Sequence, residues 1–292
     1  MQKNEFKTYH PVVNFIYFVL IIGFSCVFMH PISLCISLFS ALIYSSVLKV
    51  NLRIKYILPM FIGMAILNPI FSHGGVTILS YLPSGNPLTL EAIIYGIAAS
   101  AMLISIICWF FCYNEVMTSD KFIYLFGRVI PSLSLVLSMT LRFVPRFIEQ
   151  MKKISQAQKA IGKGVGEGNY INRIKNGISV ISVMITWSFE NAIDTADSMK
   201  SRGYGTKGRT SFSIFKFDKR DIKALTVIVI LGLYIIVGGI FDGMYVKYFP
   251  SIRYDISVYS LSVFLAYLIF CLIPLIIEMW EVIKWKYIIS KI

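Results

Sequence analysis

Charged residues are scarce in this chain of 292 residues: Asp, Glu, Lys and Arg make up 15% of it, against about a quarter in a typical soluble protein. Hydrophobic residues make up 57%. Six apolar stretches contain none of the four charged residue types, and they cover residues 12–29, 32–48, 56–71, 92–113, 224–241 and 256–277. Because about 20 apolar residues of helix cross a bilayer, we predict an all-α membrane protein with about six transmembrane helices. The first stretch lacks the ordered regions of a secretory signal peptide, so we expect it to be retained as a helix.

The absence of ionisable residues from these stretches also bears on transport. An autonomous secondary transporter or channel usually places ionisable groups or broken helices within the membrane, where they bind the substrate or the coupling ion. Here only Glu91 and Glu278 fall at the edges of predicted spans. A secondary transporter or channel is therefore the alternative hypothesis rather than the leading one.

Basic residues are nearly absent from one side of the predicted membrane protein. Of the 28 Lys and Arg residues, 18 lie between residues 114 and 223, and only Lys247 and Arg253 fall on the opposite side. Since cytoplasmic loops carry the excess of Lys and Arg, we predict a multi-pass protein of the cell membrane with both termini in the cytoplasm. The predicted parts are four spans in residues 1–113, a cytoplasmic helical module in residues 114–221 and two spans in residues 222–292. The net charge of +13 follows from this topology and favours anionic lipid over nucleic acid as a partner.

Histidine and cysteine are too scattered to indicate a catalytic or metal site. The topology places His10 on the cytoplasmic side and both His30 and His73 outside, so the three cannot form one site of a membrane-embedded enzyme. All five cysteines lie in the apolar stretches; Cys108 and Cys112 share a helix face, but no His or carboxylate joins them. We expect these two to be small buried hydrophobic side chains, and we expect no catalytic residue, metal or cofactor.

The cytoplasmic module contains three helical patterns, of which the first two are interrupted by proline or glycine. The first follows an N-cap signal at residues 118–120. The second begins near Ser132 or Ser134 and runs through Pro145, where a kink is expected. It ends in a glycine-rich stretch at residues 162–168.

The third helical pattern is the most regular. Its apolar residues recur mainly at steps of three and four, and they are Ile171, Ile174, Ile178, Ile181, Ile185, Ala192, Ala196 and Met199. The apolar centre at residues 178–189 is followed at once by Glu190, so the segment is too short and too charged to span a bilayer. We expect long amphipathic helices that lie on or beneath the membrane.

Residues 203–210 match the spacing of a phosphate-binding loop, GxxxxGK[ST], except that Arg209 replaces the essential Lys. Such a loop needs a strand before it and a helix after it, so that backbone amides point at the phosphates. Here a helical pattern precedes the segment instead. We therefore do not expect it to bind a nucleotide.

The third pattern ends in Ser201-Arg202-Gly203. Gly203 can adopt the left-handed conformation that ends a helix, which places Arg202 at the last turn. A guanidinium group held there can bind a carboxylate of a partner in a bidentate manner that Lys does not reproduce. A simple helix cap with a solvated cation is the alternative interpretation.

In the order and spacing of its motifs, the chain resembles the transmembrane T component of energy-coupling factor (ECF) importers, a family that includes the cobalt-transport protein CbiQ. The similarity covers most of residues 9–210. The residues that carry it are His10-Pro11, Asn68, Gly74-Gly75, Leu88-Thr89-Leu90-Glu91, Tyr95-Gly96, Leu141-Arg142-Phe143-Val144-Pro145, Ala157-Gln158-Lys159-Ala160-Ile161-Gly162 and Met199-Lys200-Ser201-Arg202-Gly203-Tyr204-Gly205.

The resemblance implies two docking signatures of the form Ala-Arg-Gly, at the ends of two coupling helices that seat in grooves of two ATPase subunits. The second signature is present as Ser201-Arg202-Gly203. The first is Ala160-Ile161-Gly162, in which Ile161 stands where the Arg belongs, and Lys159 and Lys163 are the nearest cations.

The resemblance also implies a role as scaffold and transmitter without catalysis of its own. A separate small membrane subunit, the S component, would bind a vitamin or a transition metal, and two cytosolic ATPases would hydrolyse ATP. This chain would join the ATPases to the S component within the bilayer.

Overall fold

The computed structural model describes residues 5–50, 54–72, 74–81, 87–127, 131–204, 215–241, 244, 246–254 and 257–289. The chain divides into two compact units. The first consists of residues 1–122 and 215–292, and the second of residues 123–214.

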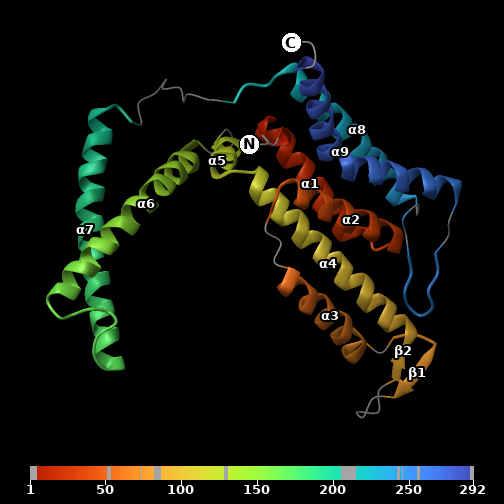
Figure 1. The fold of residues 1–292 in the computed structure, drawn as a ribbon, viewed down its shortest axis with the longest axis horizontal. Helices are drawn as coiled ribbons and strands as arrows, with labels where there is room; N and C mark the ends of the chain where they lie inside the picture. The colour runs from red at the N-terminus through yellow and green to blue at the C-terminus, as the bar shows by residue number, and fades with distance from the viewer. Residues whose placement is uncertain are drawn as a thin grey trace. The chain divides into compact units, whose positions relative to one another are not determined.

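All six predicted apolar stretches form helices in the first unit (Figure 1), and these are α1 (Pro11–Val27), α2 (Pro31–Val47), α3 (Ile54–Phe71), α4 (Leu90–Val116), α8 (Lys219–Ile240) and α9 (Val258–Ile289). By length and composition α4, α8 and α9 can each cross a membrane, whereas α1, α2 and α3 are shorter apolar helices. The prediction of an all-α membrane protein is thereby confirmed.

The first two helices begin with the same His-Pro signal. Pro11 and Pro31 each take the first helical position, where their fixed φ suits the helix and no backbone N–H is lost. His10 Nδ1 accepts a hydrogen bond from the N–H of Val12 at 3.3 Å, and His30 Nδ1 accepts one from the N–H of Ile32 at 3.2 Å. These two histidines are therefore helix caps on separate helices, while His73 lies outside the described residues.

A hydrogen-bonded group centred on Ser37 of α2 lies in the core of the first unit. Ser37 Oγ lies 2.7 Å from Ser25 Oγ of α1 and 2.6 Å from Ser105 Oγ of α4, and it accepts a hydrogen bond from Trp109 Nε1 of α4 at 3.0 Å. The Tyr267 hydroxyl of α9 lies 3.3 Å from Ser25 Oγ. All five residues are buried, so the polar groups of four helices satisfy one another within an apolar core.

Helix α3 packs closely on α4 at Gly96. A Cβ atom at this position would lie 2.9 Å from the carbonyl oxygen of Ala65, closer than real side-chain contacts allow. The glycine therefore lets the two backbones approach, as small residues do between membrane helices.

The return of the chain into the first unit is fixed by Asp221, near the start of α8. Its Oδ1 accepts the N–H of His10 at 3.1 Å, and its Oδ2 accepts the N–H of Asp218 at 3.0 Å. The carboxylate thus bonds two backbone donors that neither helix can satisfy, and it joins the start of α8 to the start of α1.

The second unit contains the two long helices that the sequence predicted, α6 (Pro131–Ala160) and α7 (Tyr170–Ser201). They form a hairpin in which the helices cross (Figure 1), with the rings of Phe147 and Trp187 5.5 Å apart. Pro145 lies inside α6. The short helix α5 (Ser119–Gly127) matches the first predicted pattern and lies across the division between the units.

Two features of the first unit were not predicted. A two-stranded antiparallel hairpin of β1 (Ile78–Tyr81) and β2 (Pro87–Thr89) follows α3. Helix α9 continues to Ile289, beyond the predicted end of the last span at residue 277. The extension carries a charged pair at helical spacing, Glu281 and Lys284, whose side chains approach to 3.7 Å.

Candidate functional site

Helix α7 ends in a Schellman cap at the predicted signature. Gly203 has a φ of +70°, in the left-handed region that favours glycine. Its N–H donates to the carbonyl of Lys200 at 3.1 Å, and the N–H of Tyr204 donates to the carbonyl of Met199, also at 3.1 Å. This pair of bonds defines the motif and makes Arg202 the C-cap residue.

Helix α6 ends in the same motif. Gly162 has a φ of +73° and its N–H donates to the carbonyl of Lys159 at 3.0 Å. The N–H of Lys163 donates to the carbonyl of Gln158 at 2.9 Å. Ile161 therefore occupies the C-cap position of α6.

The residues of the two signatures occupy corresponding positions in the two caps. Ala160 and Ser201 end their helices, Ile161 and Arg202 follow as C-caps, and a left-handed glycine comes next in both. The side chain of Ile161 is 65% exposed, so an apolar group is presented where the other cap presents a guanidinium group. The geometry thus makes the two ends equivalent in backbone but different in chemistry, while their role in docking stays a prediction.

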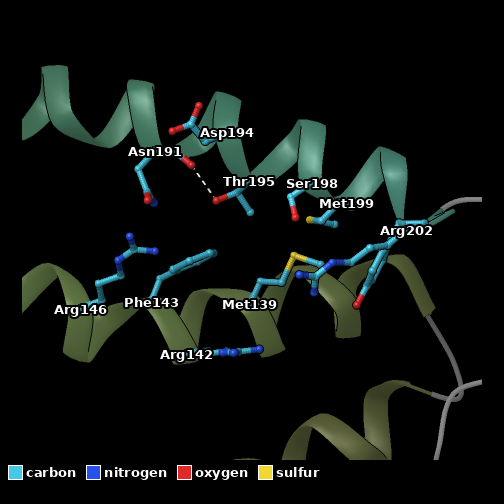
Figure 2. Close-up of a pocket in the computed structure, with 11 residues that line it drawn as sticks. Met139, Arg142, Phe143, Arg146, Asn191, Asp194, Thr195, Ser198, Met199 and Arg202 are labelled. Carbon is cyan, nitrogen blue, oxygen red and sulfur yellow. Dashed lines mark hydrogen bonds between the residues drawn. The ribbon is translucent and has the colours of Figure 1, made fainter.

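The Arg202 side chain lies in a cleft of about 520 Å³ between α6 and α7 (Figure 2). Arg146, Phe143 and Met139 extend from α6 toward α7, and Arg202 runs from the end of α7 toward Met139. Arg142 also lines the cleft. The structure therefore brings Arg202 of α7 into the same cleft as Arg142 and Arg146, which belong to the other helix of the hairpin.

Sequence reasoning missed Arg142 and Arg146 as members of this site. Arg142 was named only within a motif of the family resemblance, and Arg146 directly follows that motif. The available signal was their spacing of four residues, which places both on one side of α6. Nothing in the sequence showed which part of α7 would face them.

The charge of this cleft is unbalanced. Of the described residues that line it, three carry a guanidinium group, and Asp194 is the only one with a carboxylate. Arg146 also stacks near the ring of Trp187, at 5.8 Å from its centroid. The cleft therefore suits a negatively charged group, since Arg binds carboxylates and phosphates with two parallel hydrogen bonds.

A second groove between α6 and α7 is apolar. It has a volume of about 480 Å³ and is lined by residues that include Phe147, Met151, Met184 and Ile185. The apolar residues predicted on α7 remain largely exposed in the described structure, and they include Ile171, Ile174, Ile178, Ile181 and Ile185. The helix hairpin thus has both a basic cleft and an apolar surface.

The described residues hold no group of three or more His, Cys, Asp and Glu side chains that could bind a metal ion. Cys108 and Cys112 are both buried, as predicted. The segment that resembles a phosphate loop lies mostly outside the described residues, because only Gly203 and Tyr204 of it are described.

Comparison with known proteins identifies the family of the chain. The family model described as CbiQ, cobalt transport protein, matches residues 4–212, which is more than half of the chain. The chain belongs to the CbiQ family. The family resemblance drawn from the sequence motifs is confirmed, and the chain is a multi-pass membrane protein.

Relatives named energy-coupling factor transporter transmembrane protein EcfT match part of this chain. The protein of Streptococcus equi subsp. equi is 36% identical over 104 residues, which is 35% of this chain and 39% of the relative. That of Lactococcus lactis subsp. cremoris is 39% identical over 105 residues, 36% of this chain and 40% of the relative. The chain thus matches about two fifths of the length of these curated relatives.

Proposed function

We propose that this member of the CbiQ family is the transmembrane coupling subunit of an ECF-type importer for a vitamin or a transition metal. It would link two cytosolic ATPases to a separate substrate-binding membrane subunit. The names of the EcfT relatives support this assignment. The chain itself would hydrolyse no ATP and would not be an enzyme.

The observation that carries the proposal is the pair of matching helix caps. Two long amphipathic helices end in the same Schellman motif, and one end presents Arg202. Held at a helix end, its guanidinium group fits a carboxylate in a groove of a soluble partner. Truncation of such a buried interface Arg weakens binding by about 2–4 kcal/mol, roughly thirty- to a thousandfold in affinity.

The end of α6 would dock by a different chemistry. Ile161 cannot donate a hydrogen bond, so its contact with the second ATPase would be apolar, and Lys159 or Lys163 would supply any charge there. Arg202 would therefore be the main electrostatic anchor, and more important here than in a protein with two intact signatures.

The proposal is tested by copurification of the ATPase subunits with the membrane-embedded chain. We expect Arg202→Ala to release the ATPases while membrane insertion stays unchanged, and Arg202→Lys to restore binding only in part, because a point charge does not reproduce the bidentate fork. Lys175→Ala, which removes an exposed cation near the other end of α7, is the matched control. An Arg202→Ala protein that retains its ATPases and supports full uptake would leave the signature as an ordinary helix cap.

A further inference from the structure

Three arginine side chains line the cleft between α6 and α7, and only Arg202 belongs to a predicted signature. Arg142 and Arg146 come from successive turns of one face of α6. Asp194 is the only carboxylate among the described lining residues, so these residues together carry an excess of two positive charges.

Apart from the contact of Arg146 with the ring of Trp187, this grouping of arginines has no evident benefit for folding. Like charges at a spacing of four residues destabilise a helix slightly, and Arg142 and Arg146 are both exposed. Their charged ends therefore bury no core surface, and the described lining holds three guanidinium groups against one carboxylate. Locally unfavourable charge of this kind is expected where a ligand or partner supplies the balance.

We propose that the cleft receives an acidic segment of the ATPase subunit that docks at the end of α7, and that Arg142 and Arg146 bind its carboxylates together with Arg202. This inference rests on the proposed function and extends the docking surface from one residue to a site formed by two helices.

The lining of the cleft specifies the kind of segment. Met139, Phe143 and Met199 supply apolar contacts beside the arginines, so the segment would carry apolar side chains next to its acidic ones. A volume of about 520 Å³ lies in the range of protein clefts that enclose a small ligand, and it suits a few side chains rather than a whole helix. Asp194 would repel an incoming carboxylate and thus weaken binding.

The repulsion by Asp194 gives the inference a test that misfolding cannot imitate. The probe is the ATPase pair that copurifies with the wild-type chain, titrated onto the full chain in nanodiscs. We expect Arg142→Gln and Arg146→Gln each to weaken binding by roughly fivefold or more, and to flatten its dependence on salt concentration. Asp194→Asn should tighten binding by about two- to fivefold, because it removes a like charge from the cleft. Lys175→Gln is the control and should change neither the affinity nor its dependence on salt concentration.

The outcomes separate this inference from the proposed function. If the Arg142→Gln, Arg146→Gln double variant and Asp194→Asn bind within twofold of wild type while Arg202→Ala does not, the acidic-segment site is wrong and the docking role of Arg202 stands. If Arg202→Ala also binds normally, the proposed function itself fails. Repeating the titration in nanodiscs of purely zwitterionic lipid tests an anionic lipid headgroup as the occupant. Loss of the variants' effects in those nanodiscs would assign the cleft to an anionic lipid and overturn the proposal.

Discussion

Lys121 of α5 is a buried cation of the first unit, with 5% of its surface exposed. Its Nζ donates to the carbonyl of Lys7 at 2.5 Å and to the carbonyl of Val116 at 3.2 Å. The Asn14 side-chain oxygen accepts a third bond at 2.8 Å when the amide is oriented to satisfy both of its groups. Since Val116 is the last residue of α4, its carbonyl lacks a partner within the helix, and Lys121 supplies one.

We expect Lys121→Met to lower the free energy of unfolding by about 2–4 kcal/mol, because it leaves buried oxygens without a donor. Burial and the nearby Lys7 lower the pKa of Lys121 to about 8 from its ordinary 10.5. Between these pH values the unfolded chain binds the proton more readily than the folded one, so the contribution of Lys121 to stability increases as the pH is raised. Thermal unfolding in detergent at pH 7.5 and 9.5 measures this. A stability difference between wild type and Lys121→Met that shrinks at pH 9.5 would contradict the assignment.

Ile161 allows the second helix end to be tested by a gain of function. We expect Ile161→Arg to increase ATPase retention in copurification by roughly fivefold or more, because the cap already has the backbone geometry that presents Arg202. Val165→Arg adds the same charge to an exposed apolar position outside the signature, and it should leave retention unchanged. If Ile161→Arg weakens retention, the opposing groove is apolar and matched to Ile.

The residues of the candidate site differ in how far the sequence could predict them. The positions of Arg202 and Gly203 depend on a local rule, the need for a left-handed residue at the end of a helix, and the sequence was sufficient for both. Arg142 and Arg146 depend on how α6 and α7 pack, since their partner Arg202 lies on another helix. Helical periodicity gives the face on which a residue lies but not what that face contacts.

At the scale of helices, Ser37 allows a test of how the membrane core is held together. We expect Ser37→Ala to destabilise the first unit by about 1–2 kcal/mol, since the buried N–H of Trp109 loses its acceptor and hydroxyl groups on α1 and α4 lose a partner. Ser46→Ala is the matched control, because Ser46 lies on the same helix but is exposed, and its hydroxyl donates to the carbonyl of Leu42 within that helix. Unfolding in detergent measures both variants, and equal stability of the two would mean that the Ser37 group contributes nothing.

The helices were predictable because length and apolar content define them almost alone. The six stretches without charge each became a helix, and the regular pattern after residue 170 became α7. The β1–β2 hairpin was missed because its strands have only four and three residues, too few for an alternating pattern to be recognised. The end of α9 was missed since the prediction stopped at the first carboxylate, Glu278, although a helix can continue beyond the apolar core of a bilayer.

For the whole molecule, the orientation in the membrane decides whether an ATPase could reach the helix caps at all. The proposal requires that the α6–α7 hairpin and both termini face the cytoplasm and that the β1–β2 hairpin faces outward. This orientation is expected from the distribution of charge, because 18 of the 28 basic residues lie between residues 114 and 223. Moving so many Lys and Arg residues across a bilayer is strongly unfavourable, so the opposite orientation is not expected.

Labelling of introduced cysteines tests this orientation at two exposed positions, Val165 in the loop between α6 and α7 and Ser80 in β1. The background need only replace Cys26 and Cys35, because the other three cysteines are buried. We expect a membrane-impermeant maleimide to label Val165→Cys in inside-out vesicles but not in intact cells, and to label Ser80→Cys in intact cells but not in those vesicles. Each variant is thus the control for the other, since the two proteins differ only in the position of the introduced thiol. Labelling of Val165→Cys from outside intact cells would place Arg202 and Ile161 beyond the reach of any cytosolic ATPase, and the coupling role would fall with the topology.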